Sequence, residues 1–197
     1  MTLVIATEFI TMAVHHDVWT SFVKIILKSV LVLWVIVLIV GFMLPKEYEV
    51  SRSIIINADV ASVHAYSEDL ELWQQWQPWQ DADPTVKIEL GPITRGVGAS
   101  QAWRGEGGDG ELLFTQVQPN KGIDYDVWFN GKQDQAKGFL TYRAISNEET
   151  EVTWTMTGAV QTPIFGGYLA LMMDNMVGPS FQLGLFKLRS LIETGQV

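Results

Sequence analysis

The chain has 197 residues, of which 48% are hydrophobic and 18% are charged, and its formal net charge is −9. The first 45 residues hold two acidic and two basic side chains, so all of the negative charge falls on residues 46–197, where it would repel the phosphates of a nucleic acid. The sequence has no cysteine, which excludes disulfides, and His64 is the one histidine of the folded part, so we expect no metal site and no cofactor.

The N-terminal part predicts a membrane-spanning helix. Residues 29–44 read SVLVLWVIVLIVGFML, sixteen residues without a charge. Extension back to Phe22 gives an anchor at residues 22–45, long enough to cross a bilayer if Lys28 reaches the headgroups. A buried soluble helix is disfavoured because the segment lacks a polar face. A cleaved signal peptide is also disfavoured, because the apolar stretch is long and no A-x-A-like site follows.

Residues 1–21 are expected to form an N-terminal tail, and Met12 offers a later start of translation. Lys24 and Lys28 precede the anchor, whereas Lys46 and Arg52 follow it, so the basic residues on the two sides nearly balance. We expect a single-pass membrane protein with its N-terminus inside and the domain of residues 46–197 outside the cytoplasm.

The domain of residues 46–197 begins with a predicted strand, after which the spacing of the apolar residues changes from that of a strand to that of a helix. Residues 47–57 are rich in β-branched side chains and predict a strand. Residues 58–76 place apolar side chains at helical spacing, with Asn57 or Asp59 as N-cap. Pro78 ends any helix that reaches Trp76.

Strands dominate the middle of the domain, because hydrophobic and polar residues alternate there and glycine-rich turns separate the segments. The sequence GEGGDG predicts a hairpin turn and not a phosphate loop, since no Lys-Ser/Thr follows it. The six expected strands span residues 85–90, 98–105, 111–118, 122–131, 136–145 and 150–160.

The C-terminal part predicts helix. Residues 163–177 are apolar and interrupted by glycines, and residues 178–193 carry Pro179 near their start, where a helix tolerates proline. The element order indicates an α+β fold in which an antiparallel sheet curls around a long C-terminal helix. The face of the sheet that meets this helix encloses either a packed core or a cavity.

Three segments resemble the polyketide cyclase/dehydrase-like subgroup of the START-like, or SRPBCC, superfamily. The segment SRSIIINADVASVHAYSEDLELWQQWQPW is similar to the subgroup's opening, and GPITRGVGASQAW resembles its G-x-G-A-x-x-x-W segment. The segment LMMDNMVGPSFQLGLFKLRSLIE resembles its ending. The resemblance covers residues 48–194. It implies a helix-grip fold whose cavity binds lipids, sterols, hormones or polyketides, with catalysis in a minority of members.

Three tryptophans three residues apart raise the question of what their rings contact. We expect Trp73 and Trp76 to close one end of the fold, with Trp79 in the following loop. As core residues they would fix the helix against the sheet. As pocket residues they would offer rigid apolar walls to a ligand, and the sequence leaves both alternatives open.

The inward face of the sheet is the second group of expected ligand-binding residues. It is rich in aromatic rings, and its two tyrosines would supply hydroxyls, a pattern typical of a mostly apolar pocket with a few polar anchors. The adjacent Leu112 and Leu113 leave the register of the third strand open. The ligand-binding residues expected, besides Trp73 and Trp76, are Trp103, Phe114, Tyr125, Val127, Phe129, Leu140, Tyr142, Trp154, Met156, Phe181 and Leu185.

No residue is assigned a catalytic role. The side chains that could take part in catalysis are His64, Arg104, Tyr125, Tyr142 and Asp174, but no paired carboxylates and no nucleophile–base motif accompany them. We expect His64 to be structural, Arg104 to point outward and Asp174 to cap a turn. Met172, Met173 and Met176 either pack the helix or line a cavity mouth.

The sequence therefore predicts a membrane-anchored protein that binds a hydrophobic small molecule or a lipid in an internal cavity. One alternative is an enzyme of the cyclase or dehydratase type, with a polar group deep in the cavity. The other is a protein-interaction module with a filled core and an exposed apolar patch.

Overall fold

The computed structural model describes residues 2–131 and 134–196, with side chains from Phe22 onward. Residue 1 of the expected tail and residues 132, 133 and 197 of the expected domain lie outside this description. The chain divides into two compact units, which meet between Leu44 and Pro45.

The first unit is a single helix, α1 (Thr2–Met43). Its part from Phe22 to Met43 has 22 residues and carries Lys24 and Lys28 as its charged residues, and it is long and apolar enough to cross a membrane. A signal sequence near an N-terminus meets the same criteria of length and composition.

The second unit contains a seven-stranded sheet in which all neighbouring strands are antiparallel, in the order β1-β7-β6-β5-β4-β3-β2. Each expected strand is present, and β4 starts three residues early, so that it includes the second half of GEGGDG. The strands are β1 (Glu47–Ile56), β2 (Lys87–Leu90), β3 (Ser100–Gly105), β4 (Gly108–Gln118), β5 (Gly122–Phe129), β6 (Asp134–Ala144) and β7 (Thr150–Ala159).

Alternation along the strands separates a buried face from an outer face. In β7, Val152, Trp154 and Met156 are buried while the threonines between them lie on the other side. In β4, Leu112 and Phe114 point inward, which settles the register left open by the adjacent leucines. A bulge between Phe114 and Gln116 then shifts the pairing with β5.

Three short helices connect β1 to β2: α2 (Val60–Ser67), α3 (Leu70–Trp76) and α4 (Trp79–Ala82). Asp59 caps α2 by accepting a bond from the Ser62 backbone N–H at 2.7 Å. Asp69 separates α2 from α3 because its backbone is extended, and its carboxylate caps α3. Pro78 stands between α3 and α4, as expected.

The C-terminal helix α5 (Gly166–Thr194) runs without interruption across residues 177–180, so the placement of Pro179 at a helix start was wrong. A proline inside a helix removes one backbone bond, here to the Asn175 carbonyl. Pro179 is exposed, so water can satisfy that carbonyl. Buried residues on both sides of Pro179, Gly178 and Phe181 among them, hold the two halves against the sheet.

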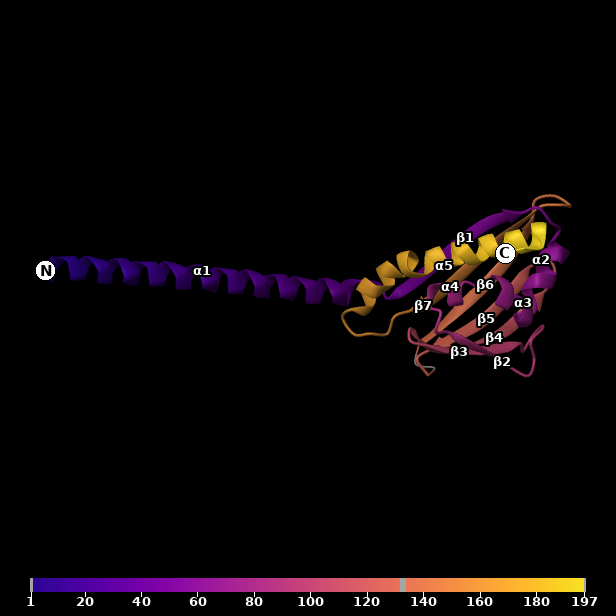
Figure 1. The fold of residues 1–197 in the computed structure, drawn as a ribbon, viewed down its shortest axis with the longest axis horizontal. Helices are drawn as coiled ribbons and strands as arrows, with labels where there is room; N and C mark the ends of the chain where they lie inside the picture. Colours follow the sequence, from indigo (N-terminus) through magenta and orange to yellow (C-terminus); the bar gives the residue numbers. More distant parts are fainter. Residues whose placement is uncertain (1, 132–133, 197) are drawn as a thin grey trace. The chain divides into compact units, whose positions relative to one another are not determined.

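Figure 1 shows α5 lying across one face of the sheet, with α2, α3 and α4 beside it. The hydrophobic core lies between this helical layer and the inward face of the strands. The expected α+β helix-grip architecture is confirmed.

Candidate functional site

A cluster of stacked and tilted aromatic rings fills the centre of the domain. The Trp154 ring of β7 stacks on Phe181 of α5, with ring centroids 4.3 Å apart and planes within 1°. The Trp73 and Trp76 rings of α3 meet Trp154 at 6.0 and 5.4 Å. All four side chains are almost completely buried, so they pack the sheet against the helices.

The polar atoms of these rings have partners inside the domain. Trp73 Nε1 donates to the Ser67 carbonyl at 2.6 Å, and Trp154 Nε1 donates to Tyr125 Oη at 2.7 Å. Burial raises the pKa of Tyr125, so its phenol is protonated at neutral pH and accepts this bond as a neutral group. The structure thus places the first two tryptophans of LWQQWQPW in the packed core.

A pocket of about 250 Å³ lies beside this cluster. Its wall comes from strands β3, β4, β5 and β7, from α4 and the loop after it, and from α5. The lining is mostly apolar and contains four aromatic rings besides the Tyr125 side chain. The lining residues are Trp79, Ala82, Asp83, Val86, Gln101, Trp103, Gly107, Gly108, Leu112, Tyr125, Val127, Phe129, Met156, Val177 and Phe181.

The pocket brings together part of the residue set expected from the sequence. Six of these residues line it: Trp103, Tyr125, Val127, Phe129, Met156 and Phe181. The other seven belong to the surrounding core: Trp73, Trp76, Phe114, Leu140, Tyr142, Trp154 and Leu185. Five of the six come from strands β3, β5 and β7, and Phe181 comes from α5, a grouping that strand alternation alone does not indicate.

Five apolar lining residues were absent from the expected set: Trp79, Ala82, Val86, Leu112 and Val177. Trp79 continues the three-residue tryptophan spacing, a signal that could have included it. Leu112 could be assigned to the inward face only once the register of β4 was known. Of the three methionines of α5, Met173 packs against the core while Met172 and Met176 are exposed, and Val177 is the residue at the pocket.

Gln101 is the buried polar side chain of the pocket wall, with 3% of its surface exposed. Its Nε2 donates to Gln77 Oε1 at 3.2 Å, and its Oε1 accepts from Gln74 Nε2 at 3.4 Å. The Nε2 of Gln77 is buried without a partner among the described residues. This glutamine network gives an otherwise apolar wall a donor and an acceptor.

Asp83 brings a negative charge to the pocket lining. Its carboxylate accepts bonds from the Thr85 hydroxyl at 2.6 Å and from the Gly107 backbone N–H at 3.1 Å. These bonds hold the pKa of Asp83 below its usual range, and the bond from the Thr85 side chain contributes most to this lowering. Asp83 is therefore ionised at neutral pH and would repel an acidic ligand.

Most of the possible catalytic side chains lie outside the pocket. His64 is buried, its Nε2 lies 3.3 Å from Glu68, and its Nδ1 has no partner among the described residues. Tyr142 contacts the edge of the His64 ring, and burial raises the pKa of Tyr142. Arg104 points outward, as expected. Tyr125 alone of the five lines the pocket, and there it is a neutral phenol bonded to Trp154.

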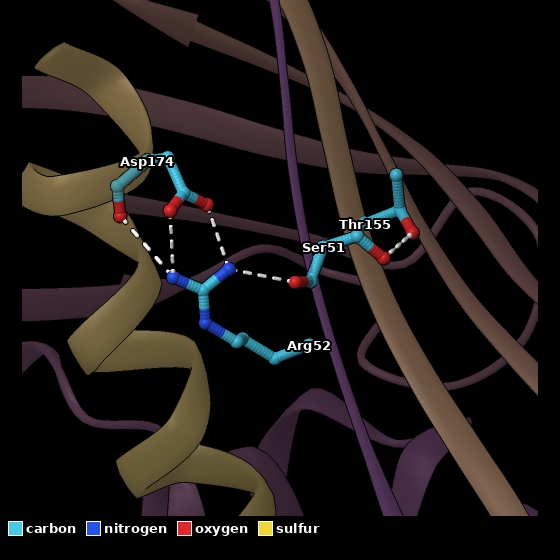
Figure 2. Close-up of polar contacts among 4 residues, drawn as sticks. All are labelled: Ser51, Arg52, Thr155 and Asp174. Atoms are coloured by element: carbon cyan, nitrogen blue, oxygen red, sulfur yellow. Dashed lines mark hydrogen bonds and ion pairs between the residues drawn. The ribbon is translucent and has the colours of Figure 1, made fainter.

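Asp174 lies in the middle of α5, so the expectation that it caps a turn was wrong. Figure 2 shows the Arg52 guanidinium of β1 donating two bonds to the Asp174 carboxylate, of 2.7 and 3.0 Å, and one to the Asp174 backbone carbonyl, of 3.4 Å. Arg52 Nη1 also donates to the Ser51 carbonyl at 2.7 Å, and the Ser51 hydroxyl bonds to Thr155 at 2.9 Å. The Arg52 side chain lowers the pKa of Asp174, so this contact ties α5 to the sheet as an ion pair.

No group of three or more histidine, aspartate or glutamate side chains suited to a metal ion occurs among the described residues. Within the lining of the pocket no nucleophile stands beside a base. The arrangement is chemically suited to holding an apolar molecule against aromatic walls, with one amide group to orient it.

Comparison with solved structures finds the same fold. A point mutant of norcoclaurine synthase from Thalictrum flavum, in complex with a transition-state analogue, aligns with a TM-score of 0.56 and 11% identity, over 74% of this chain and 94% of the other. A Chromobacterium violaceum protein gives 0.55 and 13%, over 74% and 98%. A Thermus thermophilus protein gives 0.53 and 18%, over 76% and 99%. At these identities the likeness concerns the fold alone.

No curated protein matches the chain. Residues 47–193 match the model of the family described as polyketide cyclase / dehydrase and lipid transport, which confirms the resemblance noted in the sequence. This stretch is most of the chain and includes all seven strands and nearly all of α5. The chain belongs to the polyketide cyclase / dehydrase and lipid transport family.

Proposed function

We propose that this protein binds a small, neutral, mostly apolar molecule in the pocket beside the Trp154 cluster, and that the helix from Phe22 to Met43 holds it at a membrane. The observation that carries the proposal is a pocket of about 250 Å³ whose wall combines aromatic rings with the buried amide of Gln101. The family description supports hydrophobic ligand binding in general terms.

The size of the pocket limits its ligand. An engineered cavity of roughly 150 Å³ in another protein holds benzene. A pocket of about 250 Å³ has room for a ligand of one or two fused rings, and it is too small for the acyl chains of a membrane lipid. We therefore narrow the expected ligand class from lipids in general to small ring compounds.

The polar groups of the lining restrict the chemical class of the ligand further. The Trp103 and Phe129 rings meet edge to face at 5.7 Å and offer an apolar wall to a planar molecule. Gln101 can bond one hydroxyl or carbonyl group of the ligand, and Asp83 disfavours a carboxylic acid. A neutral aromatic alcohol or ketone fits these three groups.

Membrane attachment is the second part of the proposal. The helix from Phe22 to Met43 would span the bilayer, with the domain of residues 46–197 outside the cytoplasm. Apolar compounds concentrate in bilayers, so an anchored pocket would sample a higher local ligand concentration than a free one. A cyclase or dehydratase activity is the alternative function. It has less support, because the pocket lining contains no nucleophile beside a base.

Full-length protein in phosphatidylcholine nanodiscs tests ligand binding, with 2-naphthol as probe and tryptophan fluorescence and calorimetry as readouts. The variant Val177→Trp fills the pocket from α5. Val60→Trp is the matched control, because Val60 is also a partly buried helix residue packed on the core but lies off the pocket. We expect Val177→Trp to weaken binding by about tenfold or more, equivalent to at least 1.4 kcal/mol, and Val60→Trp to leave it unchanged.

Equal affinities of the two variants would refute the pocket as the binding site. Palmitate serves as a long-chain comparison, since the pocket volume predicts that it binds far more weakly than 2-naphthol. Native mass spectrometry of the gently purified protein then shows which cellular compound, if any, accompanies it.

A further inference from the structure

An apolar stripe runs along the outer face of α5. Its members follow one another at intervals of four and three residues, so they share one side of the helix. All are exposed although they are apolar, and together they form a contiguous patch of the kind that marks an interaction surface. The stripe consists of Phe165, Leu169, Met172, Met176, Pro179, Leu183 and Phe186.

The start of α5 contacts Lys46, a residue that follows the predicted span closely in the sequence. The Lys46 carbonyl accepts a bond from the Val160 backbone N–H at 3.0 Å. A Cβ placed on Gly166 would lie 3.4 Å from Lys46 Cδ, so Lys46 touches the start of α5. Lys46 is three positions after Met43, so the length of the chain keeps their Cα atoms within about 11 Å of each other.

The segment that carries the first half of the stripe has no unpaired charge of its own. Between Phe165 and Val177 the sequence holds a single charged residue, Asp174. Figure 2 shows that its carboxylate is paired with Arg52. The second half differs, since the Arg189 guanidinium lies beside it, 5.2 Å from the centre of the Phe186 ring, whereas Lys187 is paired with Asp81.

We infer that the first half of the stripe, formed by Phe165, Leu169, Met172 and Met176, inserts into the surface of the lipid bilayer. The inference rests on the proposed membrane anchor, because the anchor brings the start of α5 within reach of the lipid. A surface of large apolar side chains without unpaired charge suits the boundary between headgroups and acyl chains. The net charge of −9 favours zwitterionic lipids over anionic ones.

This contact would connect the membrane to the pocket. Val177 follows Met176 directly and lines the pocket, as does Phe181 one turn later. One side of α5 would then lie on the lipid while the other forms the pocket wall, so an apolar ligand leaving the bilayer has a short path to its site.

The absence of cysteine permits a direct test with single labelled cysteines. Full-length Met172→Cys is labelled with a polarity-sensitive nitrobenzoxadiazole dye and reconstituted in phosphatidylcholine vesicles. Leu183→Cys is the matched control, since Leu183 is on the same stripe with 41% exposure against 53% for Met172. The two positions are about 16 Å apart along the helix. Leu33→Cys reports on the span itself.

We expect nitroxide-labelled lipids to quench the dye at residue 172 severalfold more strongly than at residue 183, and aqueous iodide to show the reverse order. Equal iodide quenching at both positions, with deep lipid quenching at residue 33, would overturn the α5 contact and leave the anchor intact. Exclusion of residue 33 from the lipid would refute the anchor itself. Shielding of residue 172 from both quenchers would also overturn the contact, in favour of a second copy of the chain on this face.

Discussion

Tyr125 and Tyr142 are both buried on the inward face of the sheet, but their hydroxyls differ. Tyr125 Oη accepts the bond from Trp154 Nε1, whereas Tyr142 Oη has no partner among the described residues. Tyr125→Phe would leave a buried indole N–H unsatisfied, which costs about 1–3 kcal/mol. Tyr142 Oη interacts with the Ser67 side chain without reaching good hydrogen-bond geometry, so we expect Tyr142→Phe to lower the free energy of unfolding less than Tyr125→Phe. Urea denaturation measures both, and equal losses would contradict this assignment.

The same tyrosines predict a loss of stability at high pH. Burial raises the pKa of both above the ordinary value of 10.0. The folded state therefore retains protons that the unfolded state releases, so this stability is complete below pH 10.0 and is lost as the pH rises through the folded-state values. Each group contributes a slope of about 1.4 kcal/mol per pH unit in that window.

Denaturation of the wild type and of the Tyr125→Phe/Tyr142→Phe variant between pH 9 and 11, roughly one unit either side of the unfolded-state pKa, measures that slope. The variant should show a much flatter dependence. Part of the slope should remain, because burial also raises the pKa of the half-buried Tyr48. An unchanged slope in the variant would show that other groups cause the alkaline transition.

At the scale of the element, glycines allow α5 to lie close to the sheet. A Cβ on Gly184 would lie 2.7 Å from Trp154 Cζ3 and 3.1 Å from Pro78 Cδ. Alanine would favour the helix itself by about 1 kcal/mol. The overpacking against a fixed ring costs about 1–3 kcal/mol, so we expect Gly184→Ala to destabilise the domain. Thermal unfolding of this variant shows whether its stability falls or rises relative to the wild type.

Gly178→Ala is the matched control within the same helix. A Cβ there would meet the end of the Arg52 side chain, which can swing toward solvent, whereas Trp154 cannot move. We expect a smaller loss than for Gly184→Ala. If Gly184→Ala proved the more stable of the two, close packing of α5 on Trp154 would not limit the fold.

At the scale of the whole molecule, the proposed role of the helix from Phe22 to Met43 is to hold the domain at a membrane. Leu33→Arg puts a charge in the middle of this helix, which costs about 2.5–3.5 kcal/mol in membrane insertion. Met43→Arg is the control, since an arginine at the helix end can reach the headgroups. We expect the wild type and Met43→Arg to resist alkaline carbonate extraction, and Leu33→Arg to be partly released. A mature chain that lacks residues 1–44 would identify a signal sequence instead.

Much of the fold could be predicted from the sequence, because its signals are local. The alternation of apolar and polar residues in β5 and β7 repeats every two residues. The apolar run before Pro45 can be recognised from its own length and composition, without knowledge of any tertiary contact. The break at Pro78 follows from the backbone preference of a single residue, whereas the break at Asp69 was not predicted, since residues 58–76 were expected to be helical. The motif resemblance added the helix-grip architecture, and the family match confirmed it.

The position of the pocket depended on tertiary structure. Strand periodicity showed which side chains face inward, but it could not separate Trp103 and Phe129, which line the void, from Phe114 and Leu140, which fill the core. Whether inward space stays open depends on how far α4 and α5 stand from each strand, and residues distant in the sequence set those distances. Three other features also depend on contacts between separate elements and could not be predicted from local sequence. They are the bulge after Phe114, the continuity of α5 past Pro179 and the pairing of Asp174 with Arg52.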